Sequence, residues 1–64
     1  MKYVEIDLDI VAMTDGAVLC DDGDDEYWIP RSCIEDGEDI DYDDIEKTLT
    51  LNVAEWFAEK EGLI

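Results

Sequence analysis

Hydrophobic and polar residues alternate at the start of the chain. Positions 4, 6, 8 and 10 are apolar, and the acidic residues Glu5, Asp7 and Asp9 stand between them. A period of two is typical of a strand with one buried face. The pattern therefore predicts a first strand that begins near residue 3 and continues to about Met13.

A tight turn follows this strand. The dipeptide Asp15-Gly16 favours a hairpin loop of two residues. With this loop, Ala12 should lie opposite Leu19, and Ile10 should lie opposite Asp21. The buried face of the first strand would then meet Ala17 and Leu19.

Two further strands are predicted over residues 17–20 and 26–34, separated by an acidic turn. Pro30 lies inside the second of these segments and cannot donate to a sheet ladder, so it indicates an edge strand or a bulge. A loop of three or five residues would place Tyr27 and Ile29 on the face of Ala17 and Leu19. The opposite face, also apolar and in need of cover, would then carry Val11, Met13, Val18, Cys20 and Trp28.

The next segment is almost purely acidic. Residues 35–46 hold eight carboxylates in twelve positions and no basic residue. This composition predicts a loop, with a short turn anchored by Ile40 and Ile45.

A fourth strand and a helix complete the chain. Alternation over residues 48–51 predicts the strand. Asn52 is a favoured N-cap residue, and an acidic residue three positions later resembles a capping box. We expect a helix from about Val53 to Glu61 that ends at Gly62, with an apolar stripe of Val53, Trp56 and Phe57 on the second apolar face of the hairpin. The fold class is α+β: a small antiparallel sheet of about four strands, a partial barrel, with one C-terminal helix packed on it.

Composition indicates a single folded domain over residues 1–64. The chain has 20 Asp and Glu against 4 Lys and Arg, no His, and a net charge of −16. Because 47% of the residues are hydrophobic, it differs from disordered acidic tails. A domain of this length is roughly 28 Å across, and a B-DNA segment of that length carries about 16 phosphate charges. The charge density of the domain therefore matches that of a duplex of its own size.

Membrane and secretory classes are not expected. Met1-Lys2-Tyr3-Val4-Glu5 lacks the apolar run of a signal peptide, and no segment approaches the ~20 apolar residues of a membrane-spanning helix. Cys20 and Cys33 are too few for a disulfide framework. We expect buried free thiols in a reducing cytosol.

Catalysis and cofactor binding are also not expected. The chain has no His, and Ser32 and Cys33 have no partner base, so the remaining acid–base groups are solvated carboxylates. Asp39, Asp41 and Asp43 have the spacing that begins an EF-hand loop, but that loop also requires Gly at its sixth position and Glu at its twelfth. Those positions are Asp44 and Thr50, so no metal or other cofactor is predicted.

The acidic residues form three clusters, which are the candidate protein-binding residues. Along a strand, alternate side chains are about 6.6 Å apart at ~3.3 Å per residue, close to two nucleotide rises of a DNA strand. The first cluster is on the first strand, the second is in the 21–26 turn, and the third is in the 35–44 loop: Glu5, Asp7 and Asp9; Asp21, Asp22, Asp24, Asp25 and Glu26; Glu35, Asp36, Glu38, Asp39, Asp41, Asp43 and Asp44.

The segment Trp28-Ile29-Pro30-Arg31-Ser32 contains the only Arg of the chain. An aromatic and proline run on a strand is typical of core packing with an edge bulge, although it could also form a recognition patch. We expect Arg31 to offset neighbouring carboxylates.

These residues resemble those of small acidic phage and prophage proteins. The resemblance is carried by Ala17-Val18-Leu19, the Asp-Gly-Asp turn, Tyr27-Trp28-Ile29-Pro30-Arg31-Ser32, the acidic loop, and the segment from Glu55-Trp56-Phe57 to Gly62-Leu63-Ile64. In size and acidity the chain is most similar to anti-CRISPR proteins that inhibit type I surveillance complexes as DNA mimics. The resemblance implies a viral protein that evades host defence by occupying the cationic site where the complex reads the PAM or holds target DNA.

The expected partner is a basic nucleic-acid-binding protein, such as a Cas subunit of a type I surveillance complex, in the cytoplasm of a bacterial host. Nucleic acid and membranes are not expected partners, and the chain could be a monomer or a homodimer. Three alternatives stay open: a DNA mimic that inhibits a restriction or repair nuclease, an acidic halophilic or structural domain without a basic partner, and a module that binds Ca²⁺ weakly through its clustered carboxylates.

Overall fold

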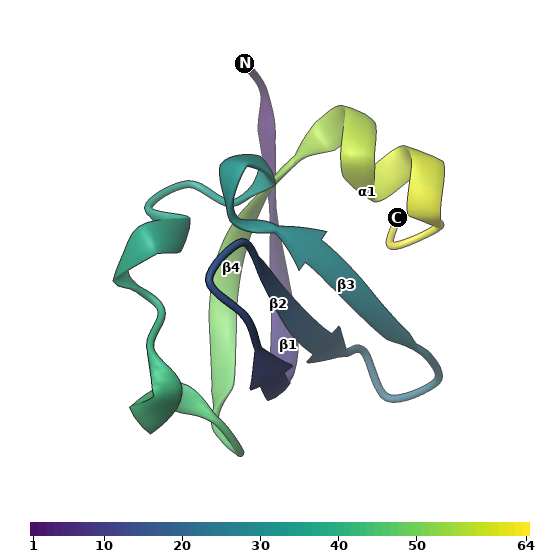
Figure 1. Ribbon diagram of the computed structural model, residues 1–64. Helices are drawn as coiled ribbons and strands as arrows, with labels where there is room; N and C mark the ends of the chain where they lie inside the picture. Colours follow the sequence, from purple (N-terminus) through teal and green to yellow (C-terminus); the bar gives the residue numbers. More distant parts are fainter.

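Strand β1 (Tyr3–Met13) is the central element of the computed structural model, which describes all residues 1–64. Its first half pairs with β4 (Thr48–Ala54), and its second half pairs with β2 (Ala17–Asp21). Strand β3 (Glu26–Pro30) lies beyond β2, which gives the antiparallel order β3-β2-β1-β4 (Figure 1). With one C-terminal helix, this open sheet confirms the predicted α+β fold.

The first hairpin has the predicted two-residue loop but not the predicted register throughout. The backbone N–H of Thr14 donates to the carbonyl of Ala17 at 2.8 Å across Asp15-Gly16. Ala12 lies opposite Leu19 as expected, but a bulge between Ile10 and Ala12 places Ile10 opposite Cys20, not Asp21. The extra residue puts both Ile10 and Met13 on the buried face, which a strict period of two cannot do.

The second hairpin corrects the predicted sheet faces. Leu19 pairs with Trp28 and Asp21 pairs with Glu26, so the loop between β2 and β3 has four residues, Asp22–Asp25. An even loop length reverses the facing of β3 relative to β2, compared with the expected three or five residues. The bulge in β1 turns Met13, Val18 and Cys20 to the inner face, and the even loop keeps Tyr27 and Ile29 on that face with them. The outer face carries Ala17, Leu19, Trp28 and Pro30.

Three 3₁₀ turns follow β3: the first replaces the end of the predicted third strand, and the other two lie in the acidic loop, which we define as residues 35–46. Pro30 ends β3, and η1 (Arg31–Cys33), η2 (Gly37–Asp39) and η3 (Tyr42–Asp44) follow. Ile40 is buried and Ile45 is half-buried, which confirms both as anchors of the loop.

The prediction that Arg31 offsets neighbouring carboxylates is wrong. Its side chain is buried, and its guanidinium donates to the carbonyls of Gly37 at 2.6 Å, Ile40 at 2.7 Å and Thr14 at 3.2 Å. A Cβ on Gly37 would strike the backbone carbonyl of Arg31. The guanidinium therefore ties the acidic loop to the β1–β2 turn through backbone atoms, and Gly37 allows the close approach that this requires.

The last strand is longer and the helix shorter than predicted. Asn52 pairs with Glu5 inside β4 and is not an N-cap, because β4 extends to Ala54. Helix α1 (Glu55–Glu61) ends, as predicted, at Gly62, which adopts the left-handed φ of 79°. Phe57 and Ala58 are buried, whereas Trp56 is 53% exposed, so Trp56 is not part of the buried stripe.

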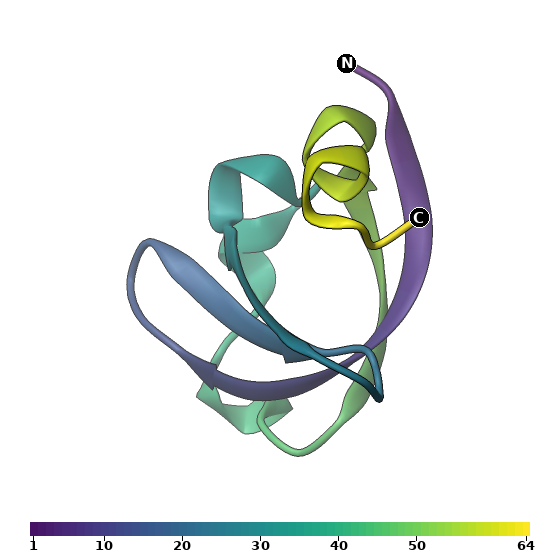
Figure 2. The same cartoon turned by 90° about the vertical axis from the view of Figure 1, so that its right-hand side faces the viewer.

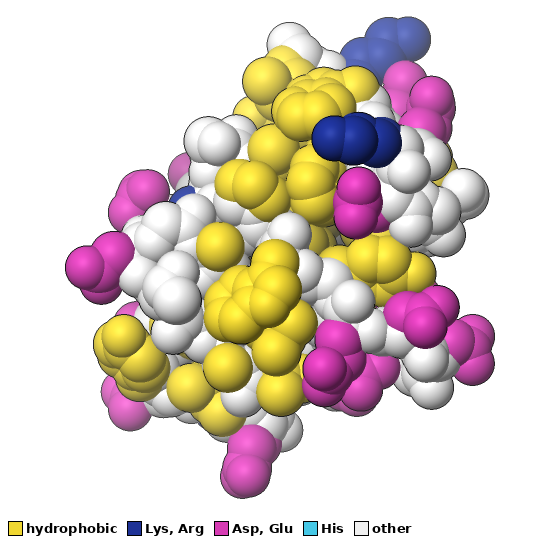
Figure 3. Space-filling model, turned by 45° about the vertical axis from the view of Figure 1, so that its right-hand side comes forward, with side chains coloured by type: hydrophobic (Ala, Val, Ile, Leu, Met, Phe, Trp, Pro, Cys, Tyr) yellow, Lys and Arg dark blue, Asp and Glu magenta, His cyan; other side chains and the backbone are white.

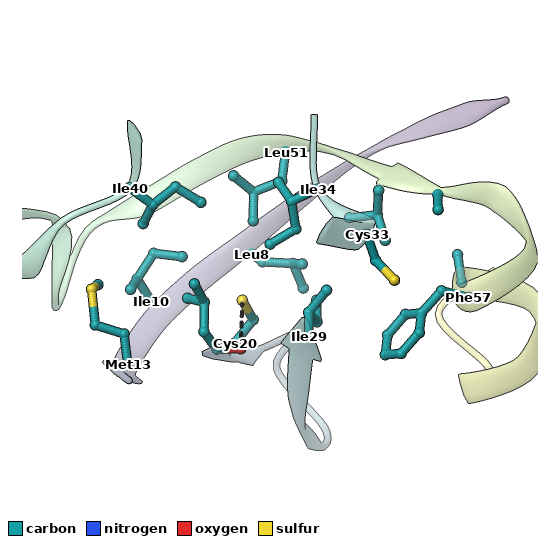
Figure 4. Close-up of a cluster of buried hydrophobic side chains, with 14 residues drawn as sticks. Leu8, Ile10, Met13, Cys20, Ile29, Cys33, Ile34, Ile40, Leu51 and Phe57 are labelled. Atoms are coloured by element: carbon teal, nitrogen blue, oxygen red, sulfur yellow. Dashed lines mark hydrogen bonds between the residues drawn. The ribbon is translucent and has the colours of Figure 1, made fainter. Parts of the chain in front are cut away.

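The core lies between the concave side of the sheet and the elements that cover it. In Figure 2 the 3₁₀ turns and α1 lie over the curved sheet. Fourteen buried hydrophobic residues form one cluster, with Leu8, Ile10 and Ile29 from the sheet facing Ile34 and Phe57 (Figure 4). Cys20 and Cys33 are free and buried within it, as the sequence predicts.

Candidate acidic interface

The carboxylates stay at the surface and almost none is neutralised. None of the 20 acidic side chains is buried. The single ion pair joins the Lys47 ammonium to an Asp44 carboxylate oxygen at 4.0 Å. Because the molecule measures only 27 × 24 × 16 Å, the net charge of −16 is concentrated on a small surface. Such a surface attracts cationic partners over long range and repels anionic ones.

The sheet brings the first-strand cluster and part of the turn cluster together. Asp9 of β1 lies directly opposite Asp21 of β2, and Asp21 lies opposite Glu26 of β3. These three carboxylates form a row across the outer face, and Asp7 and Glu5 extend it along β1. We call this array the strand surface; its residues are Glu5, Asp7, Asp9, Asp21 and Glu26.

Neighbours on β4 orient two of these carboxylates. The hydroxyl of Thr50 donates to Asp7 at 2.5 Å, and the hydroxyl of Thr48 donates to Asp9. Each threonine lies opposite its acid in the β1–β4 register. Because threonine donates a proton without adding charge, the row keeps its full negative charge while two of its side chains are fixed.

The 22–25 turn uses some of its acids to hold its own shape. An Asp22 carboxylate oxygen accepts from the backbone N–H groups of Asp24 at 2.8 Å and Asp25 at 2.9 Å, and these bonds lower the pKa of Asp22. Asp21 accepts from the N–H of Gly23 at 2.7 Å. Desolvation, together with the carboxylates of Asp22 and Asp25, raises the pKa of Tyr27. Asp24 and Asp25 accept no hydrogen bond through their side chains and extend the acidic surface at the tip.

The acidic loop forms a separate surface. In Figure 1 its 3₁₀ turns lie at the left, and the 22–25 turn lies at the lower right. Within the loop, Asp41 and Asp44 form a capping box around η3: Asp41 accepts from the N–H of Asp43 at 3.0 Å, and Asp44 accepts from the N–H of Asp41 at 3.1 Å. The remaining acids of this predicted cluster have no side-chain hydrogen bond: Glu35, Asp36, Glu38, Asp39 and Asp43.

Sequence reasoning missed an apolar area on the outer face. Trp28, assigned to the core from its motif, is 51% exposed, and the bulge residue Val11 is 37% exposed. Leu19 and Pro30 are half-buried on the same face as Trp28. The face displayed in Figure 3 shows how hydrophobic side chains gather at the surface with acidic side chains around them. The sequence gives no signal for this arrangement, because the run of acids from Asp21 to Glu26 does not mark where the strands end.

The surface carries no pocket, and no group of three or more Cys, Asp or Glu residues is arranged to hold a metal ion. No helix is long and apolar enough to cross a membrane. No protein-family model, curated protein or solved structure matches the chain.

Proposed function

We propose that this protein is an anti-CRISPR-type inhibitor that mimics DNA. It binds the cationic surface of a type I surveillance complex in the bacterial cytoplasm and blocks binding of the PAM-bearing target duplex. The observation that carries the proposal is the strand surface, a row of unpaired carboxylates that crosses three strands and turns along β1. No catalytic step is part of this function, because occupying the DNA site is sufficient for inhibition.

The spacing of the carboxylates supports mimicry of a phosphate backbone. Side chains at alternate positions of β1 are about 6.6 Å apart at ~3.3 Å per residue, close to two phosphate steps of one DNA strand at about 3.4 Å each. The sheet fixes this spacing, so little conformational entropy is lost on binding. Preorganised charge of this kind raises association rates and favours partners of opposite charge.

The experiment is a competition gel shift with a purified type I surveillance complex and its PAM-bearing duplex. We expect the protein to remove the shifted band, competitor duplex to restore it, and inhibition to weaken with rising salt as charged contacts are screened. Undiminished duplex binding at saturating protein would overturn inhibition at this step. In that case the same competition with restriction and repair nucleases tests the broader class of DNA-mimic inhibitors.

One alternative rests on the same observation. With a single ion pair among so many carboxylates, the surface also fits a halophilic or structural domain that uses salt to screen its own repulsion. Circular dichroism in low salt separates the two functions. A DNA mimic should be folded at 0.1 M NaCl, whereas a halophilic domain should unfold there and recover only at molar salt.

A further inference from the structure

The apolar area of the outer face is built around one half-exposed indole. Trp28 of β3 lies opposite Leu19 of β2, and the next pair on the same face is Asp21 with Glu26. Trp28 and Glu26 are two residues apart on one strand, so their Cα atoms are about 6.6 Å apart. Trp28 therefore lies two residue positions along the sheet from the Asp21–Glu26 pair, on the same face.

This combination matches the chemistry of an arginine side chain. A guanidinium stacks on the face of an aromatic ring, for which Trp is the best partner, and it donates paired hydrogen bonds to carboxylates in a planar fork. Its methylene stem can lie along an apolar surface, which Leu19 provides here. A lysine ammonium has neither the plane nor the fork, so it would gain less from the same site.

The composition of the chain excludes a second copy as the source of that arginine. Arg31 is the only Arg of the chain, and it is buried with its donors on backbone carbonyls. Each copy also brings a charge of −16, and the outer face adds acidic groups of its own. Nucleic acid is repelled for the same reason. The net charge of −16 instead favours a cationic protein as the occupant.

We propose that Trp28, Leu19, Asp21 and Glu26 form an arginine platform, which binds an exposed arginine of a basic partner protein. This inference deepens the proposed function and rests on it for the kind of partner, because arginine is abundant on surfaces that bind phosphate. The strand surface provides long-range attraction, and the arginine platform provides the anchor. Trp and Arg are among the residues that contribute most binding energy at protein–protein interfaces.

The other exposed tryptophan provides a matched control. Trp56 is 53% exposed, nearly the same as Trp28 at 51%. It lies on α1, packs edge-on against Phe57 at 5.8 Å, and is one helical turn from Lys60. Replacing either indole removes a similar exposed area, but only Trp28 lies in the arginine platform.

The test uses two peptides of equal charge, hexa-arginine and hexa-lysine, with the full chain at 0.1 M NaCl. Binding is measured by calorimetry and mapped by amide and indole N–H shifts in NMR spectra. We expect hexa-arginine to bind about tenfold more tightly, with the largest shifts at Trp28 and Leu19. Trp28→Ala should reduce the preference to about twofold, and Trp56→Ala should leave it unchanged. Circular dichroism confirms that both variants fold.

Three results would overturn the arginine platform: equal affinity of the original chain for the two peptides, an arginine preference that stays near tenfold in Trp28→Ala, or shifts centred on the acidic loop. These outcomes are independent of the surveillance complex. If the preference maps to Trp28 but duplex binding is unaffected, the platform stands and the proposed target is wrong. If duplex binding is blocked but the preference is absent, the proposed function stands and the platform is wrong.

Discussion

The strand surface and the acidic loop are both densely acidic, but they are held in different ways. The carboxylates of the strand surface are spaced by the pleat of a sheet and two of them accept from threonine hydroxyls. The acidic loop has no sheet partner over most of its length. It is held by the buried Arg31 guanidinium, by the Asp41–Asp44 capping box, and by its apolar anchors.

The two surfaces therefore differ in how far their carboxylates are available to a binding partner. The sheet backbone fixes the distances between these carboxylates, and each keeps at least one oxygen free for a partner, because only one oxygen of Asp7, Asp9 and Asp21 accepts a hydrogen bond. The loop uses part of its acidity to satisfy its own backbone, and its shape depends on one cation placed beneath it. We therefore expect the strand surface to contribute more to binding and the loop to be more sensitive to mutation of the core.

The largest expected effect comes from removing the guanidinium beneath the loop. Arg31→Ala leaves the carbonyls of Gly37 and Ile40 without their donor in a buried site, and each unsatisfied group costs about 1–3 kcal/mol. We expect urea unfolding to show a loss on the order of 3–4 kcal/mol, close to the total stability of a domain of this size.

Arg31→Lys serves as the control, because its single nitrogen keeps the charge and can replace Nη1, which donates to both carbonyls, but it lacks the Nε and Nη2 donors to the Thr14 carbonyl. It should recover only part of the loss. If Arg31→Ala unfolds at the same urea concentration as the original chain, the guanidinium does not hold the loop.

The next effect compares the two surfaces directly with charge-matched reversals. Replacing Glu5, Asp7 and Asp9 by Lys should weaken competition with the duplex about 100-fold, because charge pairs fixed by the sheet are lost. Reversing three loop acids that make no side-chain hydrogen bond should weaken it less than about fivefold, as expected for distant, screened charges. The loop reversals are Glu38→Lys, Asp39→Lys and Asp43→Lys.

The capping residue Asp41 is left unchanged, so that the loop keeps its structure. Both triple variants change the net charge by the same amount, and any difference between them reports position rather than total charge. Equal losses would mean that the partner senses only the net charge.

Much of this architecture was predictable from sequence, because its signals are local. The alternation along β1, the Asp15-Gly16 loop and the Gly62 helix end were confirmed. The facing of β2 was not, because the bulge in β1 has no local signal, and the length of the acidic turn was not, because several acids in a row give no boundary. The exposure of Trp28 was missed because the helix was expected to cover its face, whereas α1 covers the opposite face of the sheet.

The role of Arg31 was missed for a different reason. In so acidic a chain, charge alone favours a pairing with carboxylates, yet its partners are carbonyls at positions 14, 37 and 40. Those contacts exist only after the loop folds over the sheet, and no local pattern encodes them. The sequence places one acidic cluster on a strand and another in a loop, but it does not show that Asp21 and Glu26 of the turn cluster join the strand cluster across the sheet.

A smaller effect concerns alkaline stability of the sheet beneath the strand surface. Burial raises the pKa of the Cys20 thiol from 9.0 to about 11. Since the folded state retains the proton more tightly than the unfolded chain, stability is fully present below pH 9 and is lost as the pH rises towards 11. The loss should be about 2 kcal/mol.

Urea unfolding at pH 8 and pH 10.5 measures this slope. In Cys20→Ala, the loss of unfolding free energy between pH 8 and pH 10.5 should be clearly smaller, whatever the stability of the variant at pH 8. An unchanged slope in the variant would assign the alkaline loss to other groups, among them Tyr27, whose pKa is also raised.

The smallest effect tests whether the strand surface is maintained against its own repulsion. Asp9 and Asp21 lie directly opposite each other, and like charges at such positions destabilise a sheet by roughly 0.2–1 kcal/mol. Asp21→Asn removes the repulsion but keeps the oxygen that accepts from the Gly23 N–H, so we expect stability to rise by about 0.5 kcal/mol. Asp24→Asn, in the turn and without an acid opposite, is the control and should change less.

The gain from Asp21→Asn should shrink in 1 M NaCl, because salt screens exposed charges. The same substitution should weaken binding of hexa-arginine, since it removes one carboxylate of the arginine platform. A chain that becomes more stable and binds less well would show that the row of carboxylates is kept at a cost to the fold. A variant that gains stability without losing affinity would instead remove Asp21 from the binding surface and leave Glu26 as its acidic group.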